Sequence, residues 1–255
     1  MRVLIIGDVI GSPGRKALQK LLPGLRAQYS LDLVIANGEN AAGGLGLTLA
    51  TAQEIFAAGV QVITTGNHVW AQKEIIPYLD TELPILRPLN FPPGVPGRGH
   101  VVKDGALVVN LVGRTFMGNF DCPFRAMDHL LAELEHKPSV IIVDFHAEAT
   151  SEKVAMGRYL DGRVSAVMGT HTHVGTIDTC ILTHGTAYVT DIGMTGPADS
   201  VIGDDTEAVL YRFLTKMPRR LSVAKGKTDF TGILIDVDEE TGKASHIVRI
   251  SEEVK

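Results

Sequence analysis

Cysteine, aromatic residues and long apolar runs are all scarce in this sequence. The 255 residues include two cysteines, Cys122 and Cys180, which lie far apart and exclude both a disulfide framework and a cysteine-based zinc site. No apolar segment approaches the roughly 18 residues that a membrane-spanning helix requires. Met1–Ile6 is too short to be the apolar part of a signal peptide. We therefore expect a cytoplasmic protein with no membrane partner.

Positive charge is also limited. The chain has 24 lysines and arginines against 29 aspartates and glutamates, a formal net charge of −5 at pH 7. General nucleic-acid binding requires a basic surface that contacts phosphates, so we do not expect it in this protein. A small-molecule nucleotide held in a local pocket remains compatible with the composition. Its base cannot be predicted, because aromatic residues make up 5% of the chain and none lies in a stacking motif.

The rest of the composition is that of an ordinary globular protein, with 45% hydrophobic and 21% charged residues. The length suits one large α/β domain or two small ones. Pro84–Gly99 is rich in proline and glycine, but strand-like sequence resumes directly after it. We interpret it as a long ordered loop and expect a single domain over residues 1–255. Arg87, Asn90 and Arg98 either contact substrate or order this loop, and we favour the second interpretation.

The first third of the chain alternates strands and helices. Apolar runs predict strands over Val3–Ile6, Asp32–Ala36 and Gln61–Thr65, and the segments that follow them predict helices over Arg15–Gln28, Thr48–Ala58 and Trp70–Leu79. This order is typical of a parallel sheet. The glycine-rich turn Gly7–Arg15 matches neither the G-x-G-x-x-G motif nor the Walker motif, so we interpret it as a structural turn.

The later elements follow from similar patterns. We expect hairpins at 101–112, 177–190 and 230–250, helices at 121–136, 152–160 and 206–216, and strands at 139–143 and 164–168.

Side chains that can bind metals follow five of the predicted strands. They are Asp8, Glu39 with Asn40, Asn67 with His68, His146, and His171 with His173. Because the carboxyl ends of parallel strands lie along one edge of a sheet, we expect these groups to converge there.

Most of these residues have a structural explanation when taken singly. Asp8 could cap the first helix, the asparagines could be turn residues, and a lone histidine is more often a partly buried core residue than a ligand. Glu39 has no such explanation, because it lies in a loop of small residues after a buried strand. The five strand ends together therefore favour a metal site.

The types of ligand restrict the metal. Carboxylates, amides and imidazoles without thiolates suit iron, manganese or zinc. Seven ligands exceed what one catalytic ion with an open position accepts, so two ions about 3.5–4 Å apart fit better. With Asp8, Glu39 and a bridging hydroxide, two divalent ions would leave one positive charge, which suits a phosphate ester.

These motifs carry a family resemblance. Gly7-Asp8, Gly66-Asn67-His68 and Gly169-Thr170-His171-Thr172-His173 resemble the motifs of the calcineurin-like metallophosphoesterases. Two features depart from the usual pattern: Ile10 stands in place of a histidine, and the second strand ends in Asn37-Gly38-Glu39-Asn40. These departures, with the stretches 144–148 and 190–196, resemble the YmdB-like bacterial branch over nearly the whole chain. In the sequence, the stretch 191–196 has no physical explanation beyond turn chemistry.

The resemblance implies a four-layer α/β/β/α sandwich of two mixed sheets, with a dinuclear metal site at the carboxyl edge of the strands. It implies that Glu39 bridges the two ions. The remaining ligands would be Asp8, Asn40 and His173 for one ion and Asn67, His146 and His171 for the other. Iron is the first expectation, with manganese or zinc as alternatives, and the chain would form a homo-oligomer.

The implied activity is hydrolysis of 2′,3′- and 3′,5′-cyclic nucleotides. A metal-bridging hydroxide would attack phosphorus, and His68 would act as the general acid that protonates the leaving oxygen. Two alternatives remain open. One is a phosphomonoester or phosphoprotein phosphatase that uses the same metals, and the other is a regulatory protein that binds metal and nucleotide with little turnover.

Overall fold

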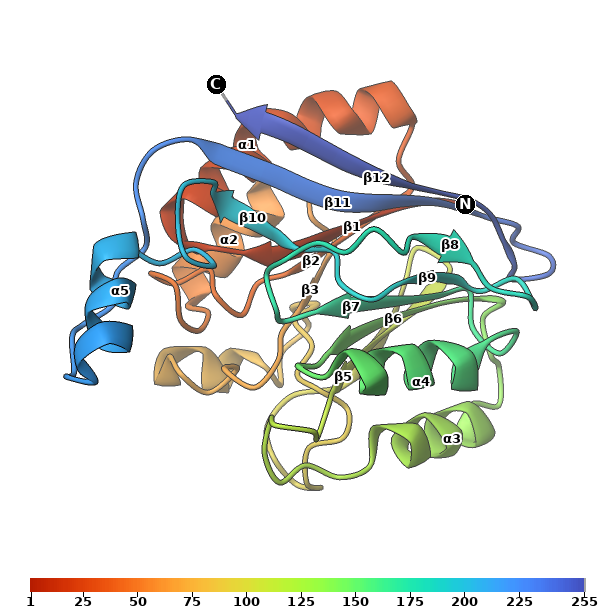
Figure 1. The fold of residues 1–255 in the computed structure, drawn as a ribbon. Helices are drawn as coiled ribbons and strands as arrows, with labels where there is room; N and C mark the ends of the chain where they lie inside the picture. The colour runs from red at the N-terminus through yellow and green to blue at the C-terminus, as the bar shows by residue number, and fades with distance from the viewer. Residues whose placement is uncertain (255) are drawn as a thin grey trace.

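The strand at the centre of the first sheet, β1 (Arg2–Val9), pairs in parallel with strands on both sides and sets the direction of the site-forming edge. The computed structural model describes residues 1–254. Two six-stranded mixed sheets pack face to face, and helices cover their outer faces (Figure 1). This is the expected α/β/β/α sandwich. No helix within residues 1–254 is long and apolar enough to cross a membrane.

The first sheet has the order β12-β11-β10-β1-β2-β3, and β11 also pairs with β1. Its other strands are β2 (Leu33–Asn37), β3 (Val62–Thr64), β10 (Met194–Pro197), β11 (Thr228–Val237) and β12 (Ala244–Val254). Helices α1 (Gly11–Tyr29) and α2 (Leu49–Ala57) lie on its outer face, whereas α5 (Thr206–Thr215) projects from one end of the molecule (Figure 1).

The second sheet has the order β4-β5-β6-β7-β9-β8. It contains β4 (His100–Lys103), β5 (Ala106–Val112), β6 (Val140–His146), β7 (Ala166–Thr170), β8 (Cys180–Ile181) and β9 (Ala187–Val189). Helices α3 (Pro123–Glu133) and α4 (Thr150–Leu160) cover its outer face (Figure 1).

Alternation along β1 explains the layers. Val3 and Ile5 point into the apolar core between the two sheets, and Leu4 and Ile6 point into the core beneath α1 and α2. All four side chains are at most 1% exposed. Each buried side chain of this size contributes roughly 1.5–3 kcal/mol, so the strand is fixed on both faces. Its carboxyl end is therefore a rigid support for a site.

Several predicted elements differ in detail. The helix expected over Trp70–Leu79 is a short 3-10 helix, η1 (Lys73–Tyr78), which contains Pro77. Proline has no N–H to donate and disfavours the helical conformation of the residue before it, so an α-helix does not form. Helix α3 ends at Glu133 rather than at His136. Strand β10 lies where we expected only a turn. The three expected hairpins are present as antiparallel pairs.

The loop between η1 and β4 is ordered by its own side chains, as expected. The Asn90 amide donates to the carbonyls of Val112 and Asp121, each at 2.8 Å. Arg87 and Arg98 likewise donate to backbone carbonyls, so all three side chains hold the loop in place.

Candidate metal centre

The predicted ligands come together where the carboxyl ends of strands from both sheets meet. Asp8 is in β1, and Glu39 and Asn67 follow β2 and β3 of the first sheet. His146 ends β6 and His171 follows β7, both in the second sheet. The expectation of a single sheet edge was therefore too simple, because the site lies across the junction of two parallel edges.

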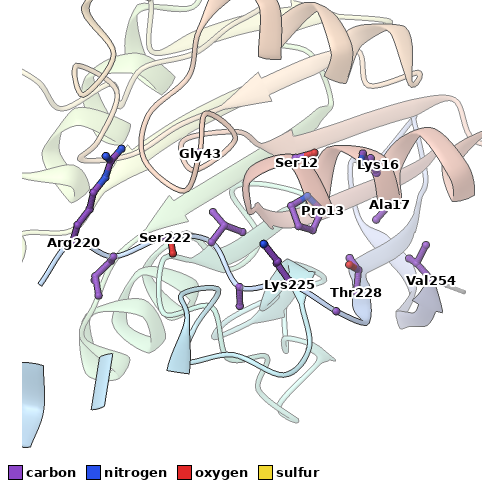
Figure 2. A pocket seen from close by; sticks show the side chains of 14 residues that line it. Ser12, Pro13, Lys16, Ala17, Gly43, Arg220, Ser222, Lys225, Thr228 and Val254 are labelled. Atoms are coloured by element: carbon purple, nitrogen blue, oxygen red, sulfur yellow. The ribbon is translucent and has the colours of Figure 1, made fainter. Parts of the chain in front are cut away.

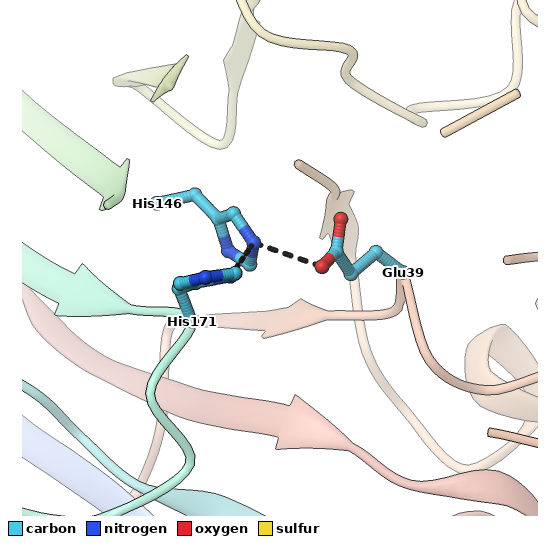
Figure 3. A group of neighbouring side chains, drawn as sticks. All are labelled: Glu39, His146 and His171. Carbon is cyan, nitrogen blue, oxygen red and sulfur yellow. Dashed lines mark hydrogen bonds and ion pairs between the residues drawn. The ribbon is translucent and has the colours of Figure 1, made fainter. Parts of the chain in front are cut away.

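The centre of the site is a group of three side chains, Glu39, His146 and His171. One ligand atom from each lies within 4.8 Å of the others. The Nε2 of His146 is 2.8 Å from the Oε1 of Glu39 and 3.0 Å from the Nδ1 of His171. Figure 3 shows the two imidazoles and the carboxylate directed at one another from three different strand ends.

Asp8, Asn40 and His173 form an adjacent group. The Asn40 Nδ2 lies 3.4 Å from the Oδ1 of Asp8 and 3.2 Å from the Nε2 of His173. The same imidazole nitrogen is 3.7 Å from the Asp8 carboxylate. The Nδ1 of His173 is 2.7 Å from the carbonyl of Ile202, a contact that directs the other ring nitrogen at Asp8 and Asn40.

Unsatisfied polar atoms make this site suitable for a cation. The Oδ1 of Asn67 is buried, and no described residue donates a hydrogen bond to it. Glu39 is 1% exposed, and among the described residues its Oε1 is paired with the His146 ring alone, at 2.8 Å. Leaving such oxygens unpaired is costly, and a metal ion is a partner that satisfies them. The residues present therefore fit a site of imidazole, carboxylate and amide ligands.

Burial and charge together shift the pKa values of the central group. Burial alone would raise the pKa of Glu39, but the His146 charge and the backbone N–H of His68 lower it to about 2. Burial alone would lower the pKa of His146, but the charges of Glu39 and Asp8 raise it to about 9. Burial and the neighbouring His146 lower the pKa of His171 to about 3. Because only a neutral imidazole binds metal, a cation would replace the His146 proton.

The backbone near the site packs closely against the ligand side chains and has unusual φ angles. A Cβ on Gly66 would overlap the ring of His146 and crowd the carboxylate of Glu39, so only glycine fits there. His171 and His173 have φ angles of 100° and 66°. Positive φ is unfavourable for these residues and persists only where surrounding contacts impose it.

One such contact comes from Asp191, whose role the sequence did not reveal. Its Oδ2 accepts hydrogen bonds from the backbone N–H and the hydroxyl of Thr172, at 3.1 and 2.8 Å. Lys153 lies 2.6 Å from the same oxygen, and both side chains of this ion pair are 1% exposed. Thr172 stands between the two site histidines, so the pair holds the segment that carries them. This gives the stretch 191–196 the structural explanation that it lacked.

A second set of supporting residues orients His146. The Thr170 hydroxyl lies 2.9 Å from His146 Nδ1 and donates to the Asp144 carboxylate at 2.7 Å. Asp144 also accepts from Asn37 at 3.2 Å, and burial raises its pKa to about 6. Partners of this kind fix the orientation of an imidazole ligand. A charged residue in the apolar strand, two positions before His146, was the available sequence signal.

His68 lies beside the central group without joining it. Its backbone N–H donates to Glu39 Oε2 at 3.0 Å, and its Nε2 is 3.2 Å from the amide of Asn67. The side chain lines a cavity of about 370 Å³, together with His171 and His173. The imidazole therefore faces the space that a substrate would occupy.

Comparisons with known proteins show which family this chain resembles. The sequence model of the YmdB-like protein family matches residues 4–250. The 2′,3′-cyclic-nucleotide 2′-phosphodiesterase of Bacillus subtilis is 50% identical over 98% of this chain and 96% of its own length. The crystal structure of a novel phosphatase from Mycoplasma pneumoniae has a TM-score of 0.93 at 34% identity, covering 99% of this chain and 93% of the other.

A more distant structure shows the same fold. The calcineurin-like phosphoesterase YfkN from Bacillus subtilis has a TM-score of 0.55 at 10% identity, over 99% of this chain and 90% of that one. The expected calcineurin-like fold is thus confirmed.

Proposed function

The chain belongs to the YmdB-like family of metallophosphoesterases, and on this basis we propose that it hydrolyses 2′,3′-cyclic nucleotides, with 3′,5′-cyclic nucleotides as further substrates. The observation that carries the proposal is the group of Glu39, His146 and His171, beside which the buried Oδ1 of Asn67 has no hydrogen-bond donor among the described residues. The name of the Bacillus subtilis relative supports the substrate class.

We assign seven side chains to a pair of metal ions. Glu39 would contact both, because it lies in the central group and its loop also carries Asn40. The other ligands would be Asp8, Asn40 and His173 on one side, and Asn67, His146 and His171 on the other. Two bound ions would supply a water of lowered pKa as the nucleophile and would stabilise negative charge on the phosphate.

The chain's own residues would do the remaining work. His68 faces the cavity and would donate a proton to the oxygen that leaves phosphorus. The cavity volume of about 370 Å³ lies within the range of small-ligand sites and suits a nucleotide. Asp191 and Lys153 would keep His171 and His173 in place through Thr172 during turnover.

The test combines metal content with turnover. Purified protein would be reconstituted separately with iron, manganese and zinc and assayed on 2′,3′- and 3′,5′-cyclic AMP. His68→Ala should retain the metal content of the unaltered protein, because its imidazole is not a ligand. It should lose about 10²–10⁴-fold in kcat, the usual contribution of a general acid. Full activity in this variant would disprove the acid role, and loss of metal would instead make His68 a ligand.

A phosphatase acting on monoesters is a second candidate, because the Mycoplasma pneumoniae relative is called a phosphatase. A comparison of kcat/KM on an aryl phosphomonoester and an aryl phosphodiester would decide between the two. A regulatory binding protein would show tight nucleotide binding by calorimetry with no product.

Three finer assignments belong to the same proposal. Iron is our first choice of metal, and elemental analysis of freshly purified protein would test it. We place the enzyme in the cytoplasm, consistent with the two free cysteines, Cys122 and Cys180. We also expect a homo-oligomer, which light scattering would test.

A further inference from the structure

A basic segment interrupts the acidic character of this chain. Residues 212–227 contain no aspartate or glutamate, although the net charge of the protein is −5. They include six basic residues, namely Arg212, Lys216, Arg219, Arg220, Lys225 and Lys227. The segment comprises the end of α5 and the chain that leads into β11.

Part of this segment lines a cavity of about 740 Å³ beside the start of α1, which we call the basic cavity (Figure 2). None of its lining residues within 1–254 is acidic. Its polar lining consists of three cations and three hydroxyls, from Ser12, Lys16, Arg220, Ser222, Lys225 and Thr228.

The three cations are available to a ligand. Lys16, Arg220 and Lys225 are exposed, and none makes an ion pair or hydrogen bond with the part of the chain that the structure describes. By contrast, the neighbouring Lys227 pairs with Glu253 at 3.2 Å. The positive charge of the basic cavity is therefore not neutralised within the protein.

The basic cavity shares a wall with the cavity of the metal centre. Gly43 lines the basic cavity, and the next residue, Gly44, lines the cavity that contains His68. On the other side, the backbone N–H of Ala224 donates to the carbonyl of Gly203 at 2.9 Å, and Gly203 lines the metal-centre cavity. A molecule longer than one nucleotide could pass over this wall from one cavity to the other.

We propose that the basic cavity binds the phosphodiester that precedes a terminal 2′,3′-cyclic phosphate, so that the substrates include the 3′ ends of short single-stranded RNA. This inference rests on the proposed function. The cyclic phosphate would enter the metal centre, and the 5′-linked phosphate of the same nucleotide would extend toward Arg220 and Lys225.

The chemistry of the substrate determines which cyclic nucleotides can reach the basic cavity. A 2′,3′-cyclic phosphate leaves the 5′ oxygen free to carry another nucleotide, whereas a 3′,5′-cyclic nucleotide uses that oxygen in its ring. Only the first class can place a second phosphate in the basic cavity. No aromatic side chain lines this cavity. Binding should therefore depend on phosphate charge and salt rather than on the base.

The experiment compares 2′,3′-cyclic AMP with the dinucleotide ApA that ends in a 2′,3′-cyclic phosphate. In the metal-loaded protein, kcat/KM for the dinucleotide should be about tenfold higher at low salt, the effect of one charge-assisted contact. The advantage should shrink as salt is raised. The double variant Arg220→Gln, Lys225→Gln should bring the ratio of the two kcat/KM values close to one.

The controls separate the possible outcomes. Arg125→Gln removes an exposed arginine on α3, on the outer face of the second sheet, and should leave the ratio unchanged. An unchanged ratio in the double variant, or equal kcat/KM values in the unaltered protein, would overturn this inference while leaving the proposed function intact. Circular dichroism would show that the double variant is folded.

A binding measurement covers the remaining case. If neither substrate is hydrolysed, the proposed function fails, and fluorescence anisotropy with a labelled triadenylate that carries a 3′-phosphate still tests the basic cavity. Salt-sensitive binding that weakens about tenfold in the double variant would support the site. Equal binding by both proteins would refute it.

Discussion

Asp191→Asn is the most informative single substitution among the residues that hold the metal-site histidines in place. The aspartate forms a 2.6 Å ion pair with Lys153, and both side chains are 1% exposed. It also accepts hydrogen bonds from Thr172 and, at 2.8 Å, from the backbone N–H of Gly193. The substitution conserves size but leaves the Lys153 ammonium buried without a counter-charge.

The expected loss can be estimated from this geometry. Removing one partner of a buried ion pair costs about 3–5 kcal/mol, because the other charge is left uncompensated. This loss is smaller than most of the usual range of total stability, roughly 5–15 kcal/mol, so we expect the variant to fold. The segment around Thr172 would loosen, and the positive φ angles of His171 and His173 would relax. We therefore expect a lower denaturation midpoint together with weaker metal retention.

Urea denaturation and elemental analysis after dialysis would measure the two effects. Asp128→Asn is the matched control, because Asp128 pairs with Arg163 at 2.7 Å with side chains that are 43% and 37% exposed. Exposed pairs contribute about 0–1 kcal/mol, so the control should lose little. A loss below about 1 kcal/mol in Asp191→Asn, or full metal retention, would refute the reasoning.

A double substitution separates stability from positioning. Lys153→Met, Asp191→Leu removes both charges and should recover much of the lost stability, because a buried ion pair can often be replaced by apolar groups. It should still retain less metal, since Thr172 would have lost its carboxylate acceptor. Recovery of both properties would show that Asp191 acts on stability alone.

Three further predictions address separate parts of the structure. Thr48→Ala removes the capping box of α2 and should lower the free energy of unfolding by about 1 kcal/mol in urea titrations; an unchanged midpoint would contradict it. Gly66→Ala should reduce metal content in elemental analysis while the circular dichroism spectrum is kept, because the new Cβ would overlap His146. Asp161→Asn tests how the stability of the fold depends on pH. Burial would raise the pKa of Asp161, but hydrogen bonds from His184 outweigh it and lower the pKa. This carboxylate therefore stabilises the fold above its unfolded pKa, and its contribution is lost as pH falls through the folded value. The stability difference between the two proteins should shrink from pH 7 to about pH 3 in urea titrations.

Most of the fold could be predicted because its strands are buried on both faces. Val3–Ile6 and Val140–Val143 are continuous apolar runs, and such runs identify strands without any knowledge of their partners. Met194–Pro197 shows the limit of this signal. Its sequence, Met-Thr-Gly-Pro, has no alternation, and it is a strand because β1 and β11 pair with it on either side.

The candidate site likewise has residues that the sequence predicted and residues that it did not. Its candidate ligands were recognisable because each lies just beyond an apolar run, a position that is visible in the local sequence. The supporting pair of Lys153 and Asp191 was not recognisable, because the two residues are 38 positions apart and the family resemblance of the stretch 190–196 does not identify a partner for Asp191. The division of strands between two sheets was also hidden from purely local patterns, which led us to expect one edge.

Because the site lies across two sheets, the distances between its ligands depend on how the sheets are held together. Glu39 and Asp8 come from one sheet, whereas His146 and His171 come from the other. Several hydrogen bonds cross this boundary, among them those from Asn37 to Asp144 at 3.2 Å, from the His171 N–H to Asp8 at 3.1 Å and from the Thr65 N–H to Asn110 at 3.0 Å. The core between the sheets is apolar, and apolar packing is non-directional, so it determines the separation of the sheets better than the sliding of one sheet along the other. Directional bonds at the boundary therefore set the spacing of the ligands, and any bound metal would strengthen the same junction.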